Sequence, residues 1–124
     1  MKPNRPVNLD LGTIRLPITA LVSILHRISG IFLVVGIAAL LYLLDLSLSS
    51  AEGFAQAVDT LSATWAKLLL WAVLAGLVYH TIAGARHLLM DIGIGESKQG
   101  GVRGARAVLV LAVLIVLVAG VWLW

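Results

Sequence analysis

The chain has no cysteine among its 124 residues. It therefore forms no disulfide, offers no thiolate nucleophile and holds no thiolate-ligated iron–sulfur cluster. Glycine motifs that bind phosphates or dinucleotides are also missing, and no basic cluster with interleaved aromatic residues indicates nucleic-acid binding. If the chain takes part in redox chemistry, the electrons must come from a partner or a non-covalent cofactor.

Charged residues are scarce as well, at 12% of the chain, whereas 60% of the residues are hydrophobic. A soluble domain usually has about a quarter charged and about half apolar residues. Residues 28–44, 68–85 and 107–124 contain no Asp, Glu, Lys or Arg. Each stretch would span about 26 Å as a helix, close to the hydrocarbon thickness of a bilayer. Because the alternation of barrel strands is absent, we predict an all-α membrane protein with three transmembrane helices.

The expected organisation is a single membrane-anchor domain over residues 1–124, with helices at about 18–45, 65–91 and 104–124. The first loop has room for a short surface helix near 52–61. The second loop, 92–104, contains five glycines and is expected to be a turn-rich connection. A cleaved signal peptide is disfavoured, because the first apolar stretch and its basic leader are both longer than such peptides have.

The basic residues predict how the chain is oriented in the membrane. They gather before the first span and around the second loop, at Lys2, Arg5, Arg15, Arg27, Arg86, Lys98, Arg103 and Arg106. The positive-inside rule therefore places the N-terminus and the second loop in the cytoplasm. The C-terminus then faces outward, into the periplasm of a bacterium. Trp65, Trp122 and Trp124 fall at the outer boundary, as an aromatic belt would.

A histidine, His80, lies within the second apolar stretch. At about 100° per residue, Gly76, His80, Gly84, His87 and Asp91 share one helical face. An ionisable side chain is costly inside a membrane, so His80 is a candidate functional residue. A neutral imidazole between glycines can bind a metal axially while a flat macrocycle lies close to the backbone, which makes a haem ligand the first hypothesis. His87 and Asp91 are better explained as interfacial residues.

A second polar cluster lies at the start of the first span. Ser23, Arg27 and Gly30 share a face there, with His26 beside it. A hydroxyl and a guanidinium one turn apart suit a quinone carbonyl in an apolar slot, or the propionates of a haem. Simpler explanations are that Arg27 is a snorkelling anchor and that Ser23 joins helices.

Three motifs together resemble a known family. They are Arg5-Pro-Val-Asn-Leu-Asp-Leu11, Ser23-x-x-His26-Arg27-x-Ser29-Gly30 and His80-x-x-x-Gly84-x-Arg86-His87-x-x-x-Asp91. Their order and spacing resemble the cytochrome b membrane-anchor subunit of bacterial succinate dehydrogenase (respiratory complex II), over nearly the whole chain. The resemblance implies a subunit of a succinate:quinone oxidoreductase in the bacterial inner membrane. Such a chain is catalytic only within the assembled enzyme.

The resemblance also implies roles for individual residues. His80 would bind the iron of haem b on one side, and a second, separate membrane-anchor subunit would supply the other ligand. The chain would thus be half of a two-subunit haem-binding bundle. Ser23 and Arg27 would line the ubiquinone-reduction site, and His26 and Arg27 would lie near the haem propionates. FAD and iron–sulfur clusters would belong to the partners only, with the flavoprotein attached through the iron–sulfur subunit.

Three alternatives remain at this stage. A quinol:fumarate reductase anchor has the same chemistry in the opposite physiological direction. A small proton-coupled transporter using His80 and Arg27 is disfavoured, because the acidic residues lie in loops or at span edges. A structural membrane subunit without a cofactor would lack the pigment of a cytochrome.

Overall fold

The computed structural model describes residues 6–7, 9–10 and 12–124, and these residues form helices and loops without any strand. The helices are α1 (Ile18–Ser49), α2 (Ala51–Ser62), α3 (Thr64–Asp91) and α4 (Lys98–Leu123). The three longest, α1, α3 and α4, are long and apolar enough to cross a membrane, which confirms the predicted all-α architecture with three candidate spans. Lys2, Arg5 and part of the first motif lie outside the described residues.

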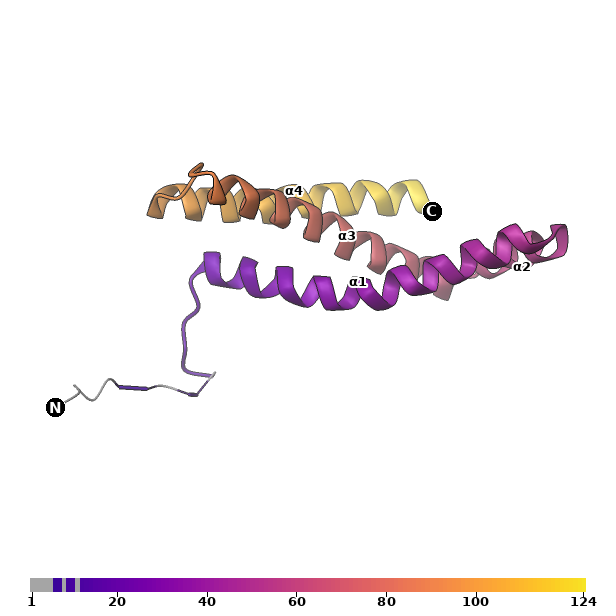
Figure 1. Cartoon of the computed structure of the whole chain (residues 1–124), viewed down its shortest axis with the longest axis horizontal. Coiled ribbons are helices and arrows are strands. Elements are labelled where there is room, and N and C mark those ends of the chain that lie inside the picture. Colours follow the sequence, from indigo (N-terminus) through magenta and orange to yellow (C-terminus); the bar gives the residue numbers. More distant parts are fainter. Residues whose placement is uncertain (1–5, 8, 11) are drawn as a thin grey trace.

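The first helix continues to Ser49, four residues beyond the expected end, because no proline or glycine interrupts it there. Ser50 then adopts an extended conformation and starts α2, where its hydroxyl accepts a hydrogen bond from the Gly53 amide at 2.9 Å. Gly53 lies directly against the Leu46 carbonyl, so α2 can fold back closely along α1. This is the surface helix expected near 52–61, and it lies at the far end of the molecule (Figure 1).

The second loop is shorter than expected, because α4 begins at Lys98 and not at residue 104. Ser97 caps the helix by accepting a hydrogen bond from the Gly100 amide at 3.0 Å. Gly93 and Gly95 make the turn with φ of 87° and 78°, which glycine adopts without steric penalty. The other three glycines of the segment belong to α4.

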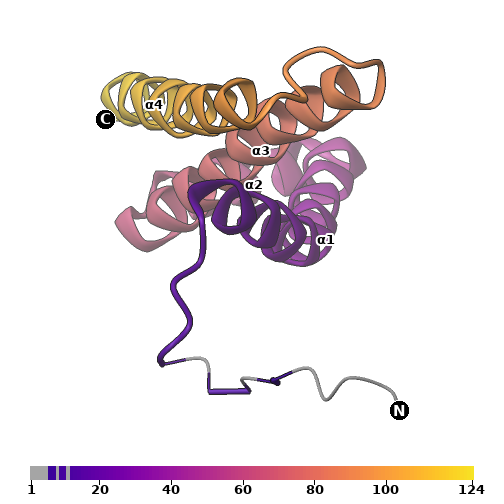
Figure 2. The ribbon, with the colours of Figure 1, turned by 90° about the vertical axis from the view of Figure 1, so that its left-hand side faces the viewer.

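The start of α1, the end of α3 and the start of α4 lie together at one end of the molecule (Figure 1), which we name the basic end. Seen from there, α3 lies between α1 and α4 (Figure 2), and it packs against both. The buried apolar cluster at this end consists of small residues, Val22, Ala83, Ala105 and Val108. Most large apolar side chains are exposed, as expected for helices that pack through small residues and face lipid.

Candidate functional site

His80 of α3 faces the polar cluster of α1. Its Nδ1 lies 2.9 Å from the Ser29 hydroxyl and 3.1 Å from the His26 carbonyl oxygen. The buried Ser29 hydroxyl donates its own hydrogen to that carbonyl at 2.7 Å. The three groups therefore form a closed set of hydrogen bonds between the two helices.

This geometry determines which nitrogen of His80 carries the hydrogen. A carbonyl oxygen can only accept, and the Ser29 hydroxyl has already used its single hydrogen, so Nδ1 must be the donor to both. The neutral ring then has its lone pair on Nε2, which has no hydrogen-bond partner in the described part of the chain. A ring held through Nδ1 by backbone and hydroxyl acceptors, with Nε2 free, has the form of a metal-binding histidine.

Three imidazoles gather at this place. The His26 ring stacks on the His80 ring with centroids 4.1 Å apart and planes 11° from parallel. The His87 ring lies 5.1 Å from the His26 ring at an angle of 56°. Among residues 6–7, 9–10 and 12–124, no three His, Cys, Asp or Glu side chains are arranged to hold a metal ion. A single nitrogen such as His80 Nε2 suits a metal that a macrocycle already holds, so the donor chemistry fits a haem.

The glycines near His80 lie where α1 and α3 pack closely against each other. A Cβ at Gly30 would lie 3.1 Å from His80 Cε1, and one at Gly84 would lie 3.3 Å from His26 Nε2. A Cβ at Gly76 would come within 2.9 Å of the Phe32 ring. The glycines on both helices therefore let α1 and α3 approach each other, and the feature that suits a macrocycle is the free Nε2 and not the glycine spacing.

The other predicted residues of α1 are divided between two surfaces. Ser23 lines a groove of about 650 Å³ between α1, α3 and α4 at the basic end. Arg27 is exposed on α1 and does not line this groove. The structure thus brings His26 to His80 and His87, and places Ser23 beside the groove, but it does not bring Arg27 into contact with either group.

Arg86 and Ser29 are the polar residues whose placement the sequence did not reveal. Arg86, expected at the edge of a span, is 8% exposed, lines the groove and donates from Nη2 to the Gly101 carbonyl at 3.1 Å. For Ser29, the available sequence signal was its place three residues after His26. For Arg86, the signal was the group of glycines beyond residue 99, because its side chain crosses α4 at Gly104. Neither signal has a meaning before the packing of the helices is known.

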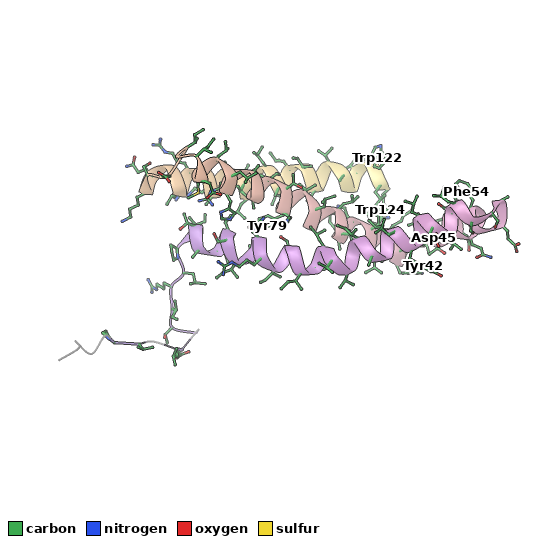
Figure 3. All side chains as sticks on the ribbon, in the orientation of Figure 1. Tyr42, Asp45, Phe54, Tyr79, Trp122 and Trp124 are labelled. Atoms are coloured by element: carbon green, nitrogen blue, oxygen red, sulfur yellow. The ribbon has the colours of Figure 1, made fainter. Side chains whose placement is uncertain are left out.

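One further polar link lies at the same end. The Tyr79 hydroxyl donates to the Val22 carbonyl at 2.7 Å and so joins α3 to the start of α1. Figure 3 shows Tyr79 at this end, and Trp122 and Trp124 at the opposite end of α4. Tyr79, His80 and Arg86 thus each donate to a backbone carbonyl of a neighbouring helix.

Known proteins give an independent comparison. Residues 1–121 match the family described as succinate dehydrogenase/fumarate reductase transmembrane subunit. The chain is 41% identical to the succinate dehydrogenase cytochrome b556 subunit of Coxiella burnetii over the full length of both. It is 36% identical to the b556 subunit of Paracoccus denitrificans, over 93% of this chain and 92% of that one. The b560 subunit of Porphyra purpurea is 30% identical, over 92% and 93%. The chain therefore belongs to the family of succinate dehydrogenase/fumarate reductase transmembrane subunits.

Proposed function

We propose that the chain anchors a succinate:quinone oxidoreductase in the bacterial inner membrane, binds haem b and forms part of the ubiquinone-reduction site. The observation that carries this proposal is the Nδ1–H form of His80, with Nε2 left without a partner among the described residues. Family membership supports it, because relatives of similar length are named cytochrome b subunits of succinate dehydrogenase. The basic end would face the cytoplasm, as the positive-inside rule requires.

His80 would bind the haem iron through Nε2. When bound, the haem would supply a carrier for single electrons. Ser29 and the His26 carbonyl would keep the imidazole in one orientation. His26 and Arg27 would lie near the propionates. A second membrane-anchor subunit would supply the other haem ligand.

Ser23 and Arg27 would donate hydrogen bonds to a carbonyl of the bound ubiquinone. As electrons arrive from the iron–sulfur subunit, negative charge develops on that oxygen, and positioned donors stabilise it before protons from the cytoplasmic side neutralise it. FAD would be on the flavoprotein, attached through the iron–sulfur subunit. The chain itself would contribute binding groups and no bond-making residue.

A fumarate reductase anchor is the second candidate, because the matching family includes both enzymes. The two differ in the direction of electron flow, so the reduction potential of the quinone bound in the native membrane separates them. The names of the full-length relatives favour succinate oxidation.

The decisive test is the optical spectrum of the complex purified with its partner subunits. His80→Leu should remove or perturb the low-spin b-type spectrum, because it removes the coordinating Nε2. His87→Leu is the matched control, since this histidine lies at the same end but touches His26 and not His80. An unaltered spectrum in His80→Leu would sink the assignment and direct attention to His26 or His87.

A further inference from the structure

Arg86 is a buried cation with unused hydrogen-bond donors. Its side chain is 8% exposed, and a guanidinium has five N–H groups. Within the described part of the chain, its only hydrogen bond or ion pair is the bond from Nη2 to the Gly101 carbonyl. Burying a charge is costly unless its donors are paired, so an acceptor from outside the chain that binds these donors would stabilise Arg86.

The position of these donors follows from two observations. Every described side-chain nitrogen that is fully buried has a hydrogen-bond partner, so the free nitrogens of Arg86 must retain accessible surface. The open space that Arg86 lines is the groove of about 650 Å³ at the basic end, which Ser23 and His87 also line. Arg86 and Ser23 thus line the same groove, where an acceptor would be within reach of both side chains.

The groove has the chemistry of a site for a small, mostly apolar ligand with an acceptor oxygen. Its volume lies within the usual range of ligand pockets, and its walls combine Ala20, Met90 and Val102 with a few donors. Glu96 and Lys98 also line it and offset each other in charge, so the charge that remains is that of Arg86. A quinone head group, flat and apolar with carbonyl oxygens, meets these requirements.

We propose that Arg86 is a quinone-binding residue, which donates from its free N–H groups to a quinone carbonyl in the groove beside Ser23. This rests on the proposed function and extends the site from α1 to α3. Reduction adds two electrons and two protons to the quinone. The electrons come from succinate through the iron–sulfur subunit and the protons come from water, so Arg86 keeps its own hydrogens and stabilises the oxygen as charge develops.

Gly104 positions this guanidinium. A Cβ at Gly104 would lie 3.1 Å from Arg86 Nε, closer than most such contacts, so glycine gives the side chain room to cross α4 at this level. The bond to the Gly101 carbonyl then fixes the direction of the fork. Because α4 begins at Lys98 and not six residues later, both glycines are helical and present this surface to Arg86.

The test uses the purified complex with its partner subunits. Arg86→Met should lower kcat/KM for quinone by about tenfold to a hundredfold, the value of a hydrogen bond from a charged donor. Succinate oxidation with a soluble dye and the b-type spectrum should remain. Arg86→Lys should lose less, because it keeps the charge but not the planar fork. Arg103→Met is the matched control, an exposed cation of the same end outside the groove.

An unchanged kcat/KM for quinone in Arg86→Met, with dye activity intact, would overturn the inference. If neither variant assembles, a photoreactive azidoquinone bound to the wild-type complex gives the answer. Label on peptides containing Ser23 and on residues 86–102 supports the site in the groove, and label confined to other peptides overturns it. A wild-type complex without succinate:quinone activity would instead remove the proposed function itself, so the two failures are distinguishable.

Discussion

The second half of α3 is joined to α1 around His80, and the first half is joined to α4 around Trp71. Both contacts use a ring nitrogen bonded to a backbone carbonyl of the neighbouring helix, and both are made possible by a glycine. Trp71 Nε1 donates to the Val116 carbonyl at 2.9 Å, with Gly120 alongside and Trp124 packed at right angles. The indole has one donor, and this bond uses it completely.

His80 differs from Trp71 because its ring has two nitrogens and the bonds to α1 use only one of them. Nδ1 is held by two acceptors and Nε2 has no partner among the described residues. Arg86 repeats this pattern with one bond made and other donors free. The two contacts are built alike but differ in how many hydrogen-bonding atoms remain without a partner. We infer that such unpartnered atoms inside a membrane bundle, and not polar side chains alone, indicate a binding site.

The largest difference between the two contacts should appear when the glycine of each is replaced by leucine. Gly30→Leu and Gly120→Leu each put a side chain where a Cβ would already lie 3.1 Å from a ring atom, of His80 and of Trp71 respectively. Overpacking should lower stability by about 1–3 kcal/mol in each case. Only Gly30→Leu should also abolish the b-type spectrum of the complex. Loss of the spectrum in Gly120→Leu would contradict the difference drawn between the two contacts.

A smaller effect is expected from removing one acceptor beside His80. Ser29→Ala leaves the His26 carbonyl as the only partner of Nδ1 among the described residues and should weaken haem retention by about tenfold to a hundredfold, as supporting residues of metal sites do. Haem loss to a competing apoprotein measures this. Ser47→Ala is the control, because Ser47 makes the same bond to the carbonyl three residues before it but none to α3. Equal haem loss in both variants would remove Ser29 from the site.

The smallest effect is expected where a single neutral hydrogen bond joins two helices. Tyr79→Phe and Trp71→Phe each remove one side-chain bond to a backbone carbonyl. Tyr79→Phe should lower the stability of the complex by about 0.5–1.5 kcal/mol. Trp71→Phe should lower it more, because it also removes ring volume packed against Trp124. Thermal unfolding in detergent measures both, and the haem spectrum should stay unchanged. A spectral shift in Tyr79→Phe alone would extend the functional region to this tyrosine.

The candidate site could be predicted only in part. Residues that are unusual on their own helix could be recognised from the sequence, and residues that depend on contact with another helix could not. His80 can be proposed from the sequence, because an ionisable ring in an apolar run is unusual on its own helix. Ser29 could not be found, because its role depends on reaching a histidine 51 residues away. From the sequence, Arg86 lies at the edge of a span. Its burial depends on α4 beginning at Lys98, which places the helical residues Gly101 and Gly104 against the Arg86 side chain. Arg27 stays a proposal, since it lies exposed on α1.

The sequence by itself determined that this is a helical membrane protein with three candidate spans, because the length and purity of an apolar run are local properties that decide how its backbone can be satisfied in lipid. Only the tertiary structure decided which hydrogen-bonding atoms have no partner among the described residues. Hydrogen-bond partners and burial are relations between helices, and only packing reveals that Nε2 of His80 and several donors of Arg86 have no partner among the described residues.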